Sequence, residues 1–160
     1  MGKLITVILK EEMEFVIDLS AKVCVVVGVS TFFNTPSVEM RRQKNDEGIQ
    51  KTYLTPKILN KIYEKATEVT ALMKLVQAGI DAGEAPAAVH IELSKKKWLK
   101  IDVFNKQSQV NILTLKDGEN QRGLAFGLNR DEWCALLLKE GEVKKTLEKL
   151  KIHIGKVWRR

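Results

Sequence analysis

The chain has 160 residues, of which 44% are hydrophobic and 29% charged, a composition typical of one globular domain with its own core. Its net charge of +7, with the excess in the second half, favours a polyanionic partner, because Lys and Arg that neutralise phosphates release counterions. No apolar run approaches the roughly 18 residues of a membrane span, and the start lacks a signal peptide's apolar stretch. We expect a cytoplasmic or nucleoid-associated protein without a membrane partner.

The first part of the chain is expected to form strands, because β-branched and apolar residues dominate its short runs. A polar stretch over residues 34–47 interrupts these runs and predicts a long loop or a ragged hairpin. The expected strands are Leu4–Leu9, Glu14–Leu19, Lys22–Phe33 and Gly48–Leu54.

A long helix is predicted to follow the first strands. Thr55 fits the N-cap and Pro56 the first helical position. The helix should end near Gly79 or Gly83, with Pro86 beyond it. Apolar residues at steps of three and four form one stripe, which we expect to offer a surface for oligomerisation. The stripe consists of Ile58, Ile62, Ala66, Val69, Met73, Val76 and Ile80.

The second half repeats this order of strands and then a helix. A turn is expected at Lys116–Asn120. The following helix opens with a capping box, Asn129 at the N-cap and Glu132 three residues later, and its apolar pattern continues to Leu150. The expected strands are Ala88–Leu93, Lys97–Phe104, Gln109–Leu115 and Arg122–Leu128.

The two strand-to-helix junctions look alike and lie about 75 residues apart, as expected of an internal duplication. Any strand that ends at a capped helix would show part of this likeness. We predict an α+β fold with a duplicated β-β-β-β-α order, in a single domain spanning residues 1–160. The repeats cover about 1–83 and 84–152, and residues 153–160 form a short basic tail.

The strand at Lys97–Phe104 carries the clearest functional signal. Alternate residues of a strand face opposite sides, so Trp98, Lys100, Asp102 and Phe104 share the face opposite to the core. Two large aromatics beside a lysine suit a platform on which nucleobases stack. The alternative is that these aromatics pack under a loop, a helix or a partner subunit. The basic run Lys95-Lys96-Lys97 just before the strand is a solvated turn or a phosphate contact.

The stretch from Lys97 to Leu150 resembles the single-stranded DNA-binding domain of the transcriptional coactivator positive cofactor four. The resemblance lies in the basic-aromatic strand ending at Phe104-Asn105-Lys106, the strand that begins at Gln109, and Leu128-Asn129-Arg130-Asp131-Glu132-Trp133 at the helix start. Arg130 stands where the family has proline. The repeated order is similar to that of Whirly-type proteins and of mitochondrial guide-RNA-binding proteins, although the lysine-glycine-rich Whirly motif is absent from the first half.

This resemblance implies two antiparallel sheets packed across one another, helices that help to join subunits into a dimer or tetramer, and binding of single strands with little sequence preference. Phe104 would match a base-stacking position and Lys106 a basic position beside it. The candidate nucleic-acid contacts over the whole chain are Arg41, Arg42, Lys51, Tyr53, Lys95, Lys97, Trp98, Lys100, Phe104, Lys106, Lys116 and Arg122.

No catalytic motif is found. Cys24 and Cys134 lack metal-ligand spacing and are expected to be buried, reduced thiols. His90 and His153 have no nucleophile pattern beside them. We therefore expect a non-enzymatic protein with no cofactor, metal or small-molecule substrate, which binds single-stranded DNA in replication, recombination or transcription. The alternatives are an RNA-binding protein of the guide-RNA chaperone type and a structural scaffold whose exposed aromatics are a protein interface.

Overall fold

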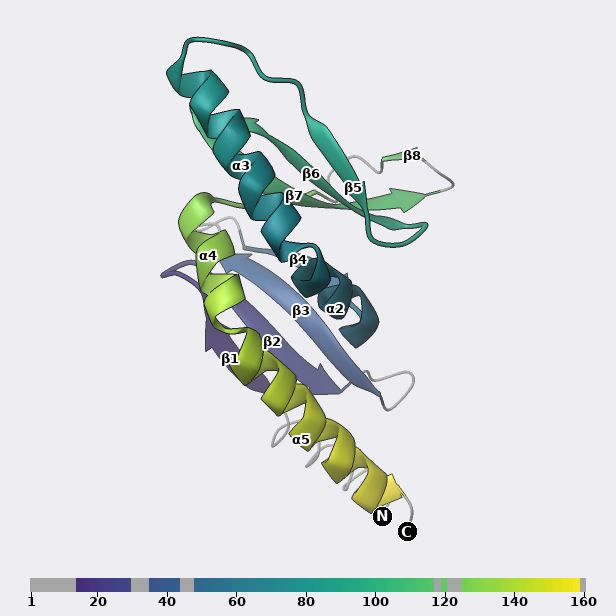
Figure 1. Ribbon diagram of the computed structural model, residues 1–160. Coiled ribbons are helices and arrows are strands. Elements are labelled where there is room, and N and C mark those ends of the chain that lie inside the picture. Colours follow the sequence, from purple (N-terminus) through teal and green to yellow (C-terminus); the bar gives the residue numbers. More distant parts are fainter. Residues whose placement is uncertain (1–13, 30–34, 44–47, 117–118, 121–124, 159–160) are drawn as a thin grey trace. The chain divides into compact units, whose positions relative to one another are not determined.

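The fold is α+β and is built around two antiparallel sheets (Figure 1). The computed structural model describes residues 14–29, 35–43, 48–116, 119–120 and 125–158. Contacts divide the chain into two compact units. One joins Met1–Pro56 to Leu138–Arg160, and the other is Lys57–Leu137. These units cut across the two expected repeats, because the helices that follow the first strands belong to the second unit.

The first unit holds a sheet with the strand order β1-β2-β3-β4. Its strands are β1 (Phe15–Asp18), β2 (Val23–Val29), β3 (Pro36–Gln43) and β4 (Ile49–Leu54). Val25, Met40 and Thr52 are paired across three strands and are all buried, which identifies the core face of this sheet. Helix α5 (Glu140–Trp158) packs against β2 and β3 (Figure 1). Its Val143 and Leu150 are fully buried.

The prediction of a loop or ragged hairpin over residues 34–47 is wrong for β3. This strand pairs with β2 along one side and with β4 along the other. Val38 and Met40 are buried on the core face, whereas Glu39 and Arg41 alternate with them on the opposite face. The prediction failed because only two buried apolar residues alternate with the charged residues of the outer face, which is too short a pattern to identify a strand from the sequence. The expected strand at Leu4–Leu9 lies outside the described residues.

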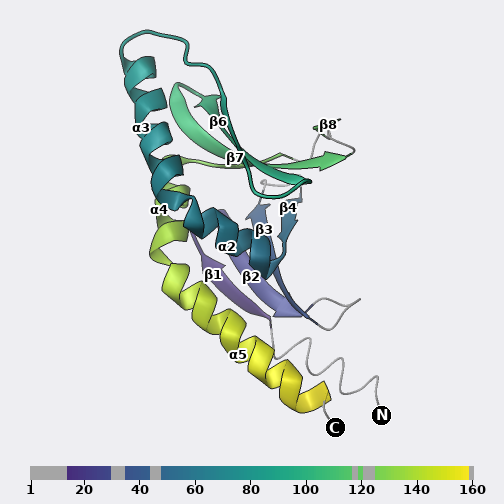
Figure 2. The same cartoon turned by 45° about the vertical axis from the view of Figure 1, so that its right-hand side comes forward.

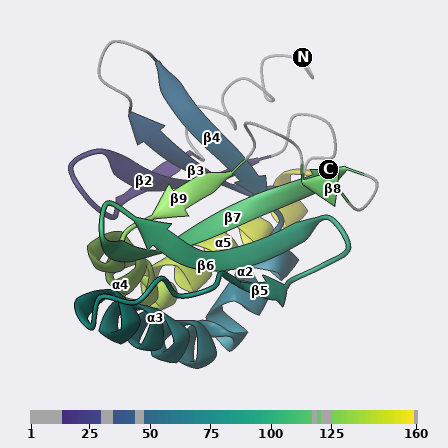
Figure 3. The same cartoon turned by 90° about the horizontal axis from the view of Figure 1, so that it is seen from above.

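The second unit holds the sheet β5-β6-β7-β9, in which β9 pairs with β7. Figure 3 shows these strands side by side, and Figure 2 shows helix α3 along the sheet. Helix α3 contacts β6 and β7. A short strand, β8, pairs with the far end of β7, within the expected turn. The strands are β5 (Val89–Glu92), β6 (Lys97–Phe104), β7 (Gln107–Lys116), β8 (Glu119–Asn120) and β9 (Phe126–Leu128).

The predicted long helix begins at Pro56 as expected, but it is divided into α2 (Pro56–Glu64) and α3 (Ala66–Asp81). Backbone hydrogen bonds still pass through Lys65, so the division is a local break rather than a loop. Gly83, at φ +78°, ends the helix; its N–H bonds to Ile80 O and that of the next residue to Gly79 O. The expected stripe is core here, since Val69, Met73 and Val76 are buried and α3 contacts β6 and β7.

The second predicted helix is likewise divided, into α4 (Arg130–Leu138) and α5. The capping box is confirmed: Glu132 N–H donates to Asn129 Oδ1 at 2.8 Å, and Asn129 N–H donates to Glu132 Oε1 at 3.0 Å. Helix α5 runs on to Trp158, so the stretch expected to be a separate tail is helical as far as that residue. Both helix starts were predictable, because caps are local in sequence.

Replacing Asn129 with alanine should lower the free energy of unfolding by about 1 kcal/mol, because Glu132 N–H then loses its side-chain acceptor at the start of α4. Urea denaturation followed by circular dichroism measures this. Asn129→Asp keeps the acceptor and serves as the control. A loss of stability as large in Asn129→Asp as in Asn129→Ala would contradict the capping role.

Candidate nucleic-acid interface

The strand register of the second unit places Trp98, Lys100, Asp102 and Phe104 on one face of β6. Leu99 and Ile101 point to the opposite face and are fully buried, as the sequence predicts. Val103, on the expected core face, is instead 40% exposed, because it lies near the end of the strand where the core stops. We call the side that carries Trp98 and Phe104 the open face of the second sheet.

Phe104 is the most exposed aromatic side chain of this face, with 60% of its surface accessible. It pairs with Gln107 across a two-residue turn formed by Asn105 and Lys106. Both turn residues have positive φ, 50° and 61°, as a type I′ hairpin requires. Glycine usually occupies the second of these positions, whereas here it is an exposed lysine two residues from the exposed ring.

Gln77 of α3 holds this turn through its side-chain amide. Its Oε1 accepts from Ser108 N–H at 3.0 Å, and its Nε2 donates to Lys106 O at 3.4 Å. The backbone on which Phe104 and Lys106 sit is thereby tied to a helix of the same unit. Gln77 could not be predicted from the sequence, since a glutamine in a helical pattern carries no signal of what it contacts in space.

Trp98 is half-buried, and its Nε1 is buried without a hydrogen-bond partner among the described residues. It is paired with Glu92 on one side and with Leu113, only 4% exposed, on the other. The alternative that Trp98 packs against its surroundings therefore applies in part. Phe104, not Trp98, is the ring that is freely accessible to a ligand.

Between the two aromatics the open face carries a connected set of polar side chains, which we call the polar ladder. Asn111 Nδ2 donates to Asp102 Oδ1 at 2.8 Å, and Gln109 Nε2 donates to Asn111 Oδ1 at 3.1 Å. Lys100 Nζ lies 3.4 Å from Asp102 Oδ2. The face itself is therefore not strongly basic, since the one ammonium group of the ladder is paired with a carboxylate.

The other predicted contacts of the second unit are not all brought together. Lys95 is exposed in the turn between β5 and β6, whereas Lys97 shares the face of the buried Leu99. Lys97 Nζ donates to Thr114 Oγ1 at 2.6 Å, and burial lowers the pKa of this lysine. Lys116 ends β7, where only its backbone is described, and Arg122 lies outside the described residues.

The first sheet brings together three of its four predicted residues. Arg41, Lys51 and Tyr53 share the face opposite to the core, while Arg42 falls on the other face one residue along β3. Tyr53 is 65% exposed. The two cations of this face, however, are not free to neutralise phosphates, because carboxylates of the same unit surround them.

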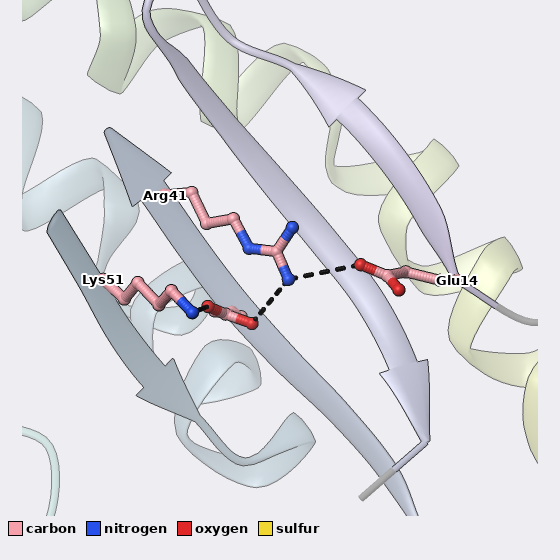
Figure 4. A network of polar contacts seen from close by, with 4 residues as sticks. Glu14, Arg41 and Lys51 are labelled. Carbon is pink, nitrogen blue, oxygen red and sulfur yellow. Dashed lines mark hydrogen bonds and ion pairs between the residues drawn. The ribbon is translucent and has the colours of Figure 1, made fainter. Parts of the chain in front are cut away.

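Figure 4 shows how these cations are paired. Arg41 Nη2 lies 3.2 Å from Glu14 Oε1 and 3.1 Å from Glu39 Oε2, and Lys51 Nζ lies 3.6 Å from Glu39 Oε1. The hydrogen bond that Arg41 donates to Glu39 raises the pKa of Arg41. Two cations facing two carboxylates give a nearly neutral network, which does not suit a phosphate track.

The prediction that both cysteines are buried is wrong. Cys134 is exposed on α4, because burial of its neighbour Trp133 turns position 134 toward solvent. Cys24 is partly exposed on the outer face of β2, and burial raises the pKa of its thiol although Arg41 opposes the shift. Cys24 also lines a shallow hollow together with Val16, Asp18 and Arg41.

Compared with profiles of known protein families and with curated protein sequences, the chain matches none. Within the described ranges, no His, Cys, Asp and Glu side chains gather in a group that could hold a metal ion. None of the helices in the described residues is long and apolar enough to cross a membrane.

Proposed function

We propose that this protein is a non-enzymatic binder of single-stranded DNA and that the open face of the second sheet receives the strand. The observation that supports this most directly is the hairpin end held by Gln77, which carries the exposed Phe104 ring two residues from the exposed Lys106. An exposed ring can stack on any base, and an adjacent ammonium group can contact the phosphate backbone. Binding of this kind needs no fixed recognition sequence, and suits a role in replication, recombination or transcription.

The distribution of lysines supports a track along β6. Lys95 and Lys96 are exposed at the turn before the strand, and Lys106 is exposed at the turn after it. A strand of eight residues spans roughly 26 Å, enough for several nucleotides. We infer that phosphates contact the two ends while bases lie on the aromatic and amide side chains between them.

We also propose that the chain is an internal duplication of the Whirly-like kind. The starts of α2 and α4, at residues 56 and 130, are 74 residues apart, as are the breaks at Lys65 and Lys139. The first hairpins agree as well. Leu19 and Ser20 both donate to Val23 O, and Leu93 and Ser94 both donate to Lys97 O.

The serines of these two hairpins act in the same way. Ser20 Oγ accepts from Val23 N–H at 3.1 Å, and Ser94 Oγ accepts from Lys97 N–H at 3.1 Å. A shared turn type alone would not explain why the helix starts and breaks are separated by the same number of residues as the hairpins. These agreements support the proposal that the two halves descend from one strands-then-helix unit.

Salt dependence tests the proposed binding. Fluorescence anisotropy with labelled oligo-dT should show the logarithm of affinity falling linearly with the logarithm of salt concentration, with a slope of about −0.7 for each phosphate contacted. Replacing Lys95 and Lys96 with glutamine should make the slope shallower by about 1.4. The charge-matched control replaces Lys61 and Lys74, which are exposed on α2 and α3, with glutamine and should leave the slope unchanged.

Competition then separates the alternatives. Stronger competition by oligo-U than by oligo-dT would favour an RNA chaperone of the guide-RNA type, and competition by duplex would contradict single-strand binding. No binding to any oligonucleotide at low salt would reject the proposal. The same samples, analysed by light scattering, test the expected dimer or tetramer.

A protein-interaction role is favoured for one surface only, the outer face of the first sheet. Its ion pairs are balanced, and the exposed side chains around them are apolar or aromatic: Val16, Ile49 and Tyr53. Balanced charge with exposed apolar groups is typical of protein interfaces rather than of nucleic-acid tracks. We therefore assign strand binding to the second sheet.

A further inference from the structure

The polar ladder has a direction that Asp102 imposes. An ionised carboxylate can only accept hydrogen bonds, so Asn111 must turn its Nδ2 toward Asp102. The Oδ1 of Asn111 then faces Gln109, which must present its Nε2. Lys100 Nζ also points to the carboxylate. Asn111 Nδ2 and Lys100 Nζ are thus directed toward Asp102, and Gln109 Nε2 is directed toward Asn111.

Acceptor positions of the polar ladder remain open to a ligand. Within the described part of the chain, Gln109 Oε1 accepts no hydrogen bond, and each oxygen of Asp102 keeps a further acceptor position. The Asp102 side chain is 28% exposed, so a ligand on the open face can reach it. The open face therefore offers acceptors to a ligand that brings donors.

Gly127 shows that the ladder is fitted into the sheet. It lies opposite Asn111 on β9, and a Cβ at this position would overlap Gln109 Nε2 and come within 3.0 Å of Asn111 Oδ1. The absent side chain leaves the space in which the two amides meet. The neighbouring strand is thus shaped around the ladder.

We propose that Asp102 and the ladder it orients form a base-reading subsite that prefers guanine within the bound strand. This inference rests on the proposed single-strand binding and adds a base preference at one position of the track. Bases laid on this face would be splayed out, with their Watson–Crick edges open to side chains. Guanine presents two adjacent donors on that edge, N1–H and the N2 amino group, which match the two oxygens of a carboxylate.

The other bases match less well. Thymine and uracil offer a single N3–H between two carbonyl oxygens, which a carboxylate repels. Adenine and cytosine offer only one exocyclic amino group beside a ring nitrogen acceptor. An acidic side chain in the middle of the track also repels phosphates, so it favours an orientation in which a base, rather than the backbone, lies over Asp102.

The test compares labelled oligo-dT with the same oligomer carrying isolated guanines, in lithium salts that prevent four-stranded assemblies. Wild-type protein should bind the guanine oligomer about tenfold more tightly, the scale of one good bidentate base contact. Inosine lacks the N2 amino group and should give an intermediate affinity. Asp102→Asn removes the charge and frees the direction of the ladder, and should bind both oligomers with equal affinity.

Glu92→Gln is the matched control, because it removes one negative charge from an exposed residue of the same open face without touching the ladder. It should raise affinity for every oligomer equally and keep the guanine preference. Gly127→Ala displaces the flexible end of Gln109 and should weaken the preference in a folded protein, as circular dichroism would verify.

The outcomes distinguish this inference from the proposed function. Equal wild-type affinity for the two oligomers, or a preference that survives in Asp102→Asn, rejects the guanine subsite and leaves single-strand binding intact. Failure to bind either oligomer at low salt rejects the proposed function itself. A preference that disappears in Glu92→Gln as well would reduce the effect to general electrostatics and overturn the role of Asp102.

Discussion

Replacing Phe104 with alanine is expected to weaken binding of oligo-dT about 5- to 150-fold and to leave the melting temperature of the protein unchanged. Stacking of a base on an aromatic ring contributes about 1–3 kcal/mol, and the 60% exposed ring of Phe104 is the most accessible of the open face. The same exposure limits its part in the core, so the free energy of unfolding should change by less than about 0.5 kcal/mol.

Two controls accompany this variant. Phe104→Tyr keeps a ring that can stack and should retain most of the affinity. Leu75→Ala removes an apolar side chain that is 69% exposed on α3 of the same unit, and should leave binding unaltered. If the wild-type protein binds oligo-dT and Phe104→Ala binds it equally tightly, the nucleic-acid strand lies on a different surface.

Replacing Trp133 with alanine is expected to lower the free energy of unfolding by about 3–5 kcal/mol, the range for removing a buried tryptophan. Trp133 is 1% exposed, and its Nε1 donates to Thr70 Oγ1 at 3.0 Å, which joins α4 to α3 within the second unit. Loss of the ring leaves a cavity and removes the bond between the two helices. Urea denaturation followed by far-ultraviolet circular dichroism measures the change.

The neighbouring position supplies the control for Trp133. Cys134→Ala changes an exposed residue of the same helix and should alter stability by no more than about 0.5 kcal/mol. Thr70→Val leaves the indole N–H without its acceptor and should cost about 1–3 kcal/mol. A wild-type unfolding midpoint in Trp133→Ala would show that this ring is not part of the core.

The two sheets have different outer faces although the order of their elements is alike. On the second sheet, Phe104 is exposed and the polar ladder leaves acceptors open. On the first, Arg41 and Lys51 are occupied by Glu39. Charge counted along the chain does not reveal this difference, because it depends on which carboxylates lie beside each cation.

Much of the candidate site was nonetheless predictable. The alternation in β6 places Leu99 and Ile101 on the core side and Trp98 and Phe104 on the other, because a period of two follows from strand geometry alone. Lys97, one of the candidate contacts, lies instead on the core side with Leu99, because adjacent residues of a strand face opposite ways and Trp98 is on the open face. Gln77 and the ladder partners of Asp102 lie on other elements and could not be inferred.

The sequence by itself determined the elements whose causes are local: the start of α2 at Pro56, the capping box at Asn129, the strand β6 and the apolar stripe through Val69 and Met73. Hydrogen bonds and side-chain periods that span a few residues decide these features. Only the tertiary structure decided that α3 packs on β6 and β7 while α5 packs on β2 and β3. It also decided that the carboxylate of Asp102 orients the polar side chains of the open face, because the pairing of distant strands sets which polar groups meet.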